Sequence, residues 1–233
     1  MSTHHSPLTT HGFFVTGTDT GVGKTLVACS LLKAFVARGL KSVGMKPVAS
    51  GAELRGNRLV HKDVTRLLAA GNIAAPLEHV NPYCFVPPIA PHIAARHAAV
   101  TIALDRIEQG FRVLAARAQV VVVEGVGGFR VPLGADTDTA QLAVRLALPV
   151  VLVVGMRLGC LNHALLAAEA ITTRGLTLAG WVANHVDPHM AAADENVRAL
   201  EALMATRLLA RIAFAADPDP AAIAATLDIG KLM

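Results

Sequence analysis

Cysteine is scarce in this chain of 233 residues, which has only Cys29, Cys84 and Cys160, at irregular spacing. An odd number of cysteines without a regular interval indicates neither a disulfide framework nor a zinc site. The sequence also lacks a long apolar run, since its longest, residues 146–156, is too short to span a membrane. We therefore expect no membrane partner and a location in the reducing cytoplasm.

Basic blocks, linkers and targeting segments are missing as well. The net charge of +4 comes from 21 Lys and Arg against 17 Asp and Glu, which are scattered along the chain, so we expect no nucleic-acid partner. No Pro- or Ser-rich stretch divides the chain, which favours one domain over residues 12–233. Residues 1–11 have no apolar segment of the kind found in secretory signals, and we expect them to form a flexible tail.

Apolar residues make up 53% of the chain and charged residues 16%, which excludes a disordered protein. Short β-branched runs alternate with longer segments rich in Ala and Leu. Strands are predicted at residues 12–16, 42–46, 119–125, 149–155, 178–184 and 208–213. Helices are predicted at residues 24–38, 61–70, 101–117, 137–146, 162–174 and 190–206. This alternation predicts an α/β fold with a mainly parallel central sheet flanked by helices.

The stretch GTDTGVGKT, residues 17–25, lies between the first predicted strand and the first predicted helix. It is close to the phosphate-binding pattern G-x-x-x-x-G-K-(S/T), although its first glycine lies one residue early. Gly21 and Gly23 allow main-chain N–H groups to turn toward phosphate oxygens, and the helix start adds its positive end. Lys24 is expected to reach the β- and γ-phosphates of ATP, and the Thr25 hydroxyl to bind Mg²⁺. A Gly-rich turn with an exposed lysine is the alternative, but this position between strand and helix favours a P-loop NTPase-like domain.

Charged residues also end two other predicted strands, on the edge where ligands bind in open parallel sheets. Lys46 is either a solvated charge or a second cation for phosphate or carbamate. Glu124 follows four valines, where a carboxylate is poorly solvated unless it is paired or bound to a metal. We favour Mg²⁺ over the alternative, an ion pair with Lys24 or Lys46. Asp63 begins a predicted helix, and the pattern alone indicates only a favourable interaction with the helix dipole.

Six segments together resemble the dethiobiotin synthetases of biotin synthesis, in the same order over residues 13–186: VTGTDTGVGKT, KPVASG, NPYCFVPPIAPH, VEGVGG, VVLVVGMRLGCLNHALL and LAGWVANH. The resemblance implies a homodimeric ligase that joins 7,8-diaminononanoate and CO₂ (or bicarbonate as its source) at the expense of ATP. One amine captures CO₂ as a carbamate, which attacks the γ-phosphate to give a carbamic–phosphoric anhydride. The second amine then closes the ring, which yields dethiobiotin, ADP and phosphate.

The positions that match the family supply the expected site residues. Lys24 and Lys46 are expected to be catalytic, and Asp63 joins Thr25 and Glu124 as a Mg²⁺ ligand. The nucleotide is expected to contact Thr20, Gly21, Val22, Gly23, Lys24, Thr25, Leu26, Asp63, Glu124, Gly125, Val126, Gly127, Asn184, His185 and Phe214. The substrate is expected to contact Ser50, Gly159, Cys160 and Asn162, the last three from a loop that serves the other subunit's site. The chain departs from the common pattern at Gly21, His185 and Asn196, where Glu, Asp and Tyr are frequent.

Two other functional classes share parts of this pattern. A ParA/MinD-like ATPase switch fits the fold and the variant loop, but such proteins normally carry a lysine early in that loop, and residues 18–22 include none. The synthetase domain of a cobyrinate-type amidase would need a glutaminase domain with a nucleophilic cysteine, for which the chain is too short.

Overall fold

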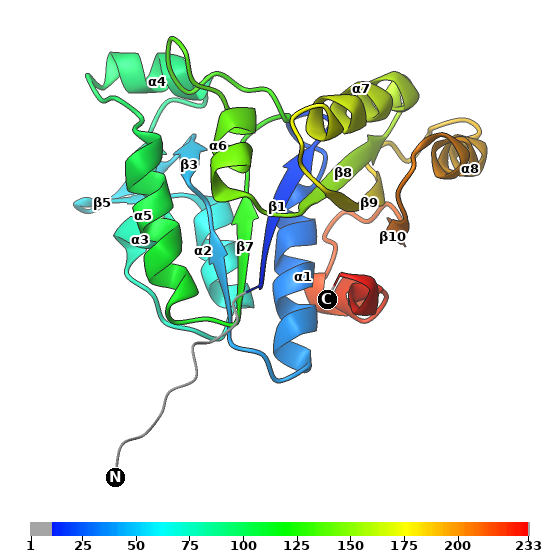
Figure 1. The fold of residues 1–233 in the computed structure, drawn as a ribbon, viewed down its shortest axis with the longest axis horizontal. Helices are drawn as coiled ribbons and strands as arrows, with labels where there is room; N and C mark the ends of the chain where they lie inside the picture. Colours follow the sequence, from blue (N-terminus) through cyan, green and yellow to red (C-terminus); the bar gives the residue numbers. More distant parts are fainter. Residues whose placement is uncertain (1–10, 233) are drawn as a thin grey trace.

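The computed structural model describes residues 11–232, in which a six-stranded parallel sheet lies between two layers of helices (Figure 1). The strand order is β10–β9–β8–β1–β7–β2. The strands are β1 (His11–Gly17), β2 (Ser42–Met45), β7 (Val120–Glu124), β8 (Val150–Met156), β9 (Leu178–His185) and β10 (Leu208–Ile212). The predicted α/β fold with a mainly parallel sheet is confirmed. Residues 1–10 of the expected tail lie outside the described residues, and His11, its last residue, begins β1.

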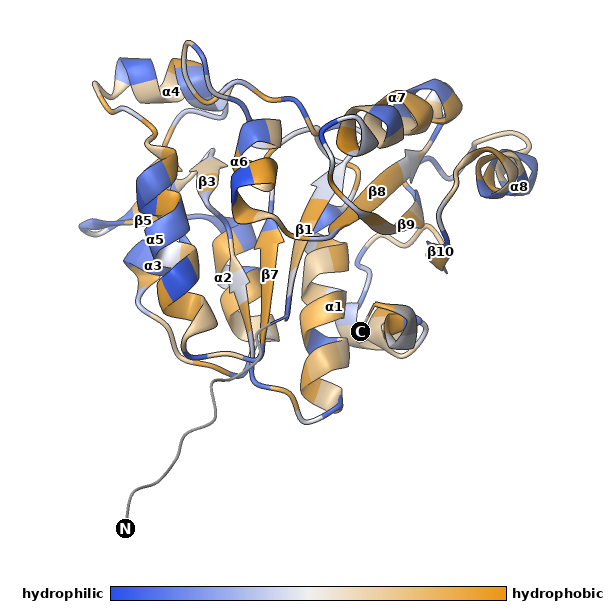
Figure 2. Ribbon diagram, in the orientation of Figure 1, coloured by the Kyte–Doolittle hydropathy of each residue, from blue (hydrophilic) through white to orange (hydrophobic). Residues whose placement is uncertain are grey.

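Both faces of the sheet are covered, which explains why its strands are almost wholly apolar. Alternate residues of β1 point to opposite faces, so that Phe13 and Val15 belong to one core and Phe14 to the other. The helices α1 (Lys24–Ala37) and α9 (Pro220–Ala224) cover the first face, and α5 (Leu104–Ala115), α6 (Thr139–Leu146) and α7 (Cys160–Thr172) cover the second. Figure 2 shows the apolar strands at the centre, with polar residues on the outer sides of the helices.

The six predicted helices are present with slightly different bounds, and the remaining two are α2 (Lys62–Ala70), beside α1, and α8 (Ala193–Leu203), beside α7. Several short elements are additional to the prediction. They are β3 (Val48–Ser50), which pairs in parallel with β6 (Tyr83–Phe85), the hairpin of β4 (Glu53–Arg55) and β5 (Arg58–Val60), the helices α3 (Leu77–Val80), α4 (Pro91–His97) and α9, and the 3₁₀ helix η1 (Ile229–Lys231). Segments this short carry too few residues for a periodic pattern to be recognised.

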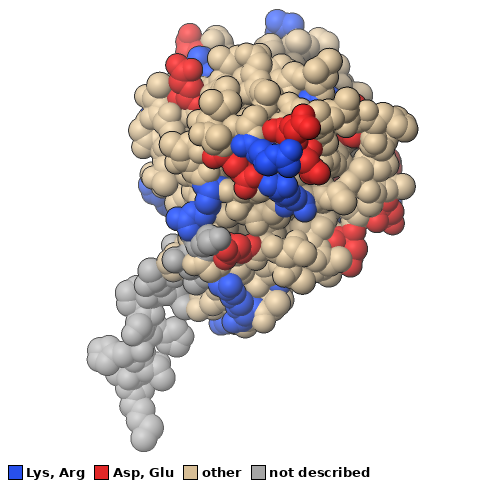
Figure 3. Space-filling model, turned by 90° about the vertical axis from the view of Figure 1, so that its right-hand side faces the viewer, with Lys and Arg blue, Asp and Glu red and all other residues tan. Residues whose placement is uncertain are grey.

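The molecular surface carries charges of both signs close together. On the face turned to the viewer in Figure 3, Lys and Arg lie next to Asp and Glu. Among the ion pairs, Arg211 contacts Glu201 at 2.5 Å and Asp194 at 3.9 Å. Within residues 11–232 we find no helix with the length and apolar character needed to cross a membrane.

Candidate active site

A cavity of about 820 Å³ opens at the carboxyl edge of the sheet, where the P-loop follows β1. Most of the residues expected at the site line it. They are Thr20, Gly21, Gly23, Lys24, Thr25, Leu26, Lys46, Ser50, Asp63, Glu124, Val126, Gly127 and Asn184. The carboxyl ends of β2, β7 and β9 therefore meet the P-loop around one space, as parallel strands require.

The P-loop bends through Gly23, which precedes α1 in the left-handed conformation with φ +93°. A Cβ atom there would lie 2.2 Å from Asn184 Nδ2, so glycine satisfies both the backbone angle and the close approach of β9. Asn184 in turn donates from Nδ2 to the carbonyl of Val22 at 2.8 Å. This contact joins the loop to the end of β9.

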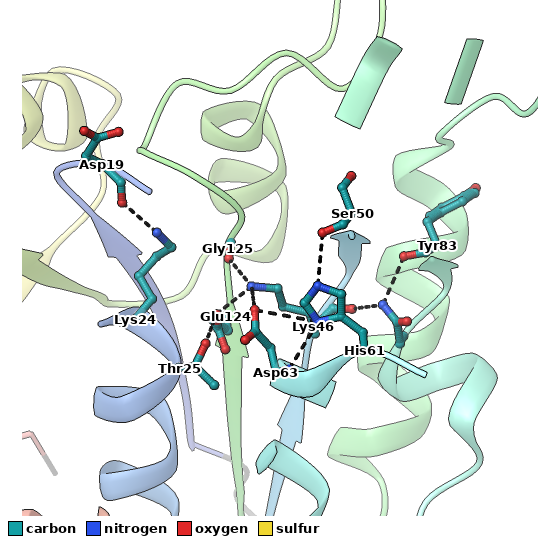
Figure 4. Close-up of polar contacts among 11 residues, drawn as sticks. Asp19, Lys24, Thr25, Lys46, Ser50, His61, Asp63, Tyr83, Glu124 and Gly125 are labelled. Atoms are coloured by element: carbon teal, nitrogen blue, oxygen red, sulfur yellow. Dashed lines mark hydrogen bonds and ion pairs between the residues drawn. The ribbon is translucent and has the colours of Figure 1, made fainter. Parts of the chain in front are cut away.

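Lys24 begins α1, and its side chain folds back across the loop. Its Nζ donates to the carbonyl of Asp19 at 2.7 Å (Figure 4). Burial and the nearby charge of Lys46 lower the pKa of Lys24 to about 8. Asp19 is held from the other side by its carboxylate, which pairs with Arg157 after β8. In this arrangement, a buried and weakly compensated cation lies at the position where nucleotide phosphates bind in P-loop proteins.

Lys46, Asp63, Glu124 and Thr25 form one polar cluster beside the P-loop (Figure 4). Lys46 Nζ lies 2.5 Å from Glu124 Oε1 and 3.1 Å from Asp63 Oδ2, and it donates to the carbonyl of Gly125 at 3.0 Å. The Thr25 hydroxyl donates to the same Glu124 Oε1 at 2.8 Å. Elements far apart in the sequence, β2, α2, β7 and α1, thus bring these side chains into direct contact.

The charges within the cluster stabilise one another. Burial works against protonation of Lys46, but the carboxylates of Glu124 and Asp63 outweigh it and raise the pKa of Lys46 above its usual value. Burial likewise disfavours the ionised form of Asp63, but the Lys46 cation outweighs that effect and lowers the Asp63 pKa. Lys46 and Asp63 are therefore ionised together near neutral pH.

The oxygen atoms of this cluster fit a Mg²⁺ ion. Glu124 Oε2 is buried and has no hydrogen-bond partner, so one carboxylate oxygen is available to a ligand. No group of three or more His, Cys, Asp or Glu side chains able to hold a metal ion occurs among the described residues. Mg²⁺ does not need one, because it usually takes one or two carboxylates and completes its shell with phosphate oxygens and water.

The other side of the cavity carries residues that were expected and residues that were not. The hydroxyl of Ser50 is buried without a hydrogen-bond partner, so it is available to bind a ligand. His61 and Arg66 also line the cavity, together with an apolar wall of Pro88, Ile89, Ala90 and Pro91. The sequence pattern indicated none of these six as site residues. For His61 the available signal was its place just before the helix of Asp63, and for the wall it was the proline-rich PPIAP segment.

Some predicted residues lie apart from the cavity lining. Val22 and Gly125 contribute carbonyl oxygens that accept hydrogen bonds from Asn184 and Lys46. His185 and Phe214 line a separate cavity of about 330 Å³. The three loop residues Gly159, Cys160 and Asn162 stand at the start of α7, outside the main cavity. Here the Cys160 N–H donates to the carbonyl of Arg157 at 3.0 Å. The N–H groups that remain to meet an anion at this helix start are those of the next residues.

Comparison with known proteins places this geometry in a family. A family model described as an AAA domain matches residues 11–222. The relative named ATP-dependent dethiobiotin synthetase BioD from Aromatoleum aromaticum is 54% identical over 215 residues, which cover 92% of this chain and 96% of that protein. The relative of the same name from Nitrosospira multiformis is 51% identical over 221 residues, which cover 95% of this chain and 96% of that protein.

Solved structures with a similar fold are more distant in sequence. A ParA family ATPase from Chlorobium tepidum matches with a TM-score of 0.54 and 14% identity, over 89% of this chain and 85% of that one. The septum site-determining protein MinD from Pyrococcus horikoshii, complexed with Mg-ADP, matches with a TM-score of 0.53 and 14% identity, over 88% and 81%. These two likenesses concern the fold alone. The identities above 50% over nearly the whole length decide the family: the chain belongs to the ATP-dependent dethiobiotin synthetases and is an ATP-dependent ligase.

Proposed function

We propose that the enzyme uses ATP to carboxylate 7,8-diaminononanoate with CO₂ and to close the ring of dethiobiotin. One amine of the substrate attacks CO₂ and loses a proton, which gives a carbamate. A carbamate oxygen attacks the γ-phosphorus of ATP, ADP leaves, and a carbamic–phosphoric anhydride forms. The second amine attacks the anhydride carbon and loses a proton, so that phosphate leaves and the cyclic urea is complete.

The observation that carries this proposal is the cluster of Lys46, Asp63 and Glu124 beside Lys24 and Thr25 of the P-loop. Negative charge develops on the transferred phosphoryl group and on the oxygens on either side of it, and fixed cations stabilise that charge. We assign Lys24 to the β- and γ-phosphates of ATP, and Lys46 to the point where carbamate and γ-phosphate meet. The Asp63 and Glu124 carboxylates hold the Lys46 amine in place, which lowers the cost of orienting it during the reaction.

Mg²⁺ is the proposed cofactor, with Thr25, Asp63 and Glu124 as its ligands, directly or through water. When bound, it would neutralise charge on the β- and γ-phosphate oxygens. The unpartnered Oε2 atom of Glu124 supports this assignment, because an oxygen left without a hydrogen bond in a buried place otherwise costs stability. Glu124 can keep its contact with Lys46 through Oε1.

The substrate side of the site is assigned to Ser50 and to the start of α7. CO₂ capture requires a neutral amine, since an ammonium group has no lone pair. The buried Ser50 hydroxyl has no partner within the protein, and we assign it a hydrogen bond to a substrate amine. We assign the far carboxylate of the substrate to the start of α7, where main-chain N–H groups and the helix dipole favour an anion. That helix start lies outside the main cavity of its own chain, which supports a homodimer with composite sites.

The cytoplasm is the proposed location. Cys29, Cys84 and Cys160 are free thiols, a state that a reducing compartment maintains.

The product assay tests this function directly. The enzyme is incubated with 7,8-diaminononanoate, bicarbonate, Mg²⁺ and ATP, and dethiobiotin and phosphate are measured by mass spectrometry and a colorimetric assay. We expect the two products in equal amounts, and neither in quantity when the diamine or bicarbonate is omitted. Phosphate release that is independent of the diamine, without dethiobiotin, would instead support an ATPase switch of the ParA/MinD kind.

A further inference from the structure

His61 links two parts of the site that sequence analysis treated separately. Its Nδ1 accepts a hydrogen bond from the main-chain N–H of Asp63 at 3.2 Å and so caps α2. A ring nitrogen that accepts a hydrogen bond carries no proton, so the ring proton is placed on Nε2. Nε2 is 3.1 Å from the carbonyl oxygen of Ser50, to which it donates (Figure 4).

These two hydrogen bonds join the two ends of a chain segment that leaves the core and returns to it. Ser50 ends β3, and the exposed hairpin of β4 and β5 follows before the chain returns to His61 and α2. The Leu54 side chain in that hairpin is 67% exposed, so the hairpin has little core of its own. The His61 side chain is only 12% exposed. The imidazole ring is therefore a well-shielded contact that holds the end of β3 against the first turn of α2.

The His61 ring lies between the two groups that have proposed roles, the Asp63 carboxylate and Ser50. The Asp63 carboxylate lies between Lys46 Nζ, at 3.1 Å, and the His61 ring, whose Nδ1 is 3.8 Å from Oδ2. On the other side, the Ser50 hydroxyl is buried and unpartnered in the cavity, while its carbonyl is held by His61. A shift of the ring would displace both groups relative to Lys46.

We propose that His61 is a positioning residue, which sets the metal-binding carboxylate of Asp63 and the substrate-binding hydroxyl of Ser50 at a fixed spacing. This inference rests on the roles proposed above for Asp63 and Ser50. Both ring nitrogens of His61 are engaged within the protein, by the Asp63 N–H and the Ser50 carbonyl, so we assign it no direct contact with the reacting atoms or the metal. His61 acts by making two hydrogen bonds from opposite sides of one rigid ring, a cap bond that accepts from the Asp63 N–H and a tether bond that donates to the Ser50 carbonyl.

Two substitutions separate the cap from the tether. His61→Asn keeps a side-chain oxygen that can cap α2, but its short amide cannot also span to the Ser50 carbonyl. His61→Ala removes both bonds. The matched control is His97→Ala, because His97 is exposed at the end of α4, away from the cavity. Thermal melting of each purified variant establishes that it is folded.

The readouts are the KM for the diamine and the affinity for Mn²⁺ in the presence of ADP. Mn²⁺ is a spectroscopic probe of the Mg²⁺ site, and its free fraction is measured by electron paramagnetic resonance without turnover. We expect both His61 variants to raise the diamine KM about tenfold, a size typical of lost supporting contacts around a site. His61→Ala should also weaken Mn²⁺ binding about tenfold, and His61→Asn less, because its cap still holds Asp63.

Asp63→Asn and Ser50→Ala distinguish failure of this inference from failure of the proposed function. If Asp63→Asn weakens Mn²⁺ binding and Ser50→Ala raises the diamine KM, while both His61 variants match His97→Ala, then His61 does not position the site. The inference is also wrong if His61→Asn has the wild-type KM, since His61 would then be a helix cap only. If neither Asp63→Asn nor Ser50→Ala has an effect, the roles proposed for these residues are wrong, and the inference is wrong with them.

Discussion

Lys46 Nζ and Glu124 Oε1 lie 2.5 Å apart, and both side chains are almost fully buried. From the sequence, an ion pair with a lysine and a Mg²⁺ ligand are alternative roles for Glu124. The structure makes these roles compatible, because Oε1 holds Lys46 and Thr25 while Oε2 has no partner. Such a pair also couples stability to function, since removal of one partner leaves the other as an uncompensated buried charge.

Glu124→Gln tests the metal assignment with little change of shape. The amide keeps one oxygen but loses the charge that attracts both Lys46 and a divalent cation. We expect a strong fall in activity and a rise of about tenfold in the Mg²⁺ concentration needed for half-maximal rate, equivalent to roughly 1.4 kcal/mol. Steady-state rates over a Mg²⁺ titration measure this effect, and an unchanged titration curve would show that Glu124 is not a ligand.

Lys46→Ala separates the two lysines of the site. Lys24 is assigned to the phosphates of bound nucleotide, and Lys46 to the transferring group. We therefore expect calorimetry to show nearly wild-type ATP affinity, while the saturated rate falls about a hundredfold or more, as when a donor to transition-state charge is removed. The Lys46 role is wrong if ATP affinity falls strongly while the rate at saturating ATP stays normal.

The sequence predicted the core of the fold well because its signal is periodic and long. The six strands of the central sheet and the helices α1, α2, α5, α6, α7 and α8 each carry enough apolar residues for their type to be recognised. The strand ends then predicted Lys46 and Glu124 at a common edge, and the resemblance added Asp63. All three lie within one cavity and in direct contact.

The parts that were missed depend on contacts between distant segments. The parallel pairing of β3 with β6 involves only three residues in each strand. His61 looks like one polar residue among several before a helix, and its contact with Ser50 exists only because the β4–β5 hairpin brings the chain back. Neither contact has a local pattern, so the sequence could place His61 just before the helix of Asp63 but could not indicate its contact with Ser50.

The lowered pKa of Lys24 predicts how stability depends on pH. Burial lowers this pKa to about 8 in the folded protein, below the ordinary lysine value of 10.5. Between these pH values the unfolded chain binds more protons than the folded one, so Lys24 makes the protein more stable as pH rises through this window. Below pH 8 both states are protonated, and the full cost of burying the charge remains.

Nucleotide binding should raise the pKa of Lys24 again. Phosphate charge favours protonated Lys24, so ADP binding at pH 8.5 should take up protons, and ADP affinity should fall as pH rises above 8. Calorimetry in two buffers of different ionisation enthalpy measures the uptake. Lys24→Gln should abolish it, whereas Lys41→Gln, at an exposed lysine outside the cavity, should not. Equal uptake by the wild type and Lys24→Gln would contradict the assignment.

We expect the start of α7 to complete the active site of the second subunit. Gly159 and Asn162 are exposed and Leu158 is 95% exposed, whereas Cys160 between them is buried in the core, so the three exposed residues are accessible to a second subunit. If the start of α7 completes the partner's site, Lys46→Ala and Asn162→Trp damage opposite parts of one composite site. Each variant alone should form inactive or nearly inactive dimers. In a mixed dimer, one site collects both lesions and the other is intact.

Mixing the two variants in equal amounts therefore restores activity without any wild-type subunit. Random reassortment makes half of the dimers mixed, and each of these has one intact site, so about a quarter of the wild-type sites should return. Exchange follows reversible dissociation or co-expression, and mass measurement of differently tagged subunits verifies it. The matched control mixes Lys46→Ala with Lys24→Ala. Both lysines line the cavity of one chain, so every mixed site keeps a lesion and no activity should return. If exchange is complete and the Lys46→Ala and Asn162→Trp mixture also stays inactive, the loop serves its own subunit.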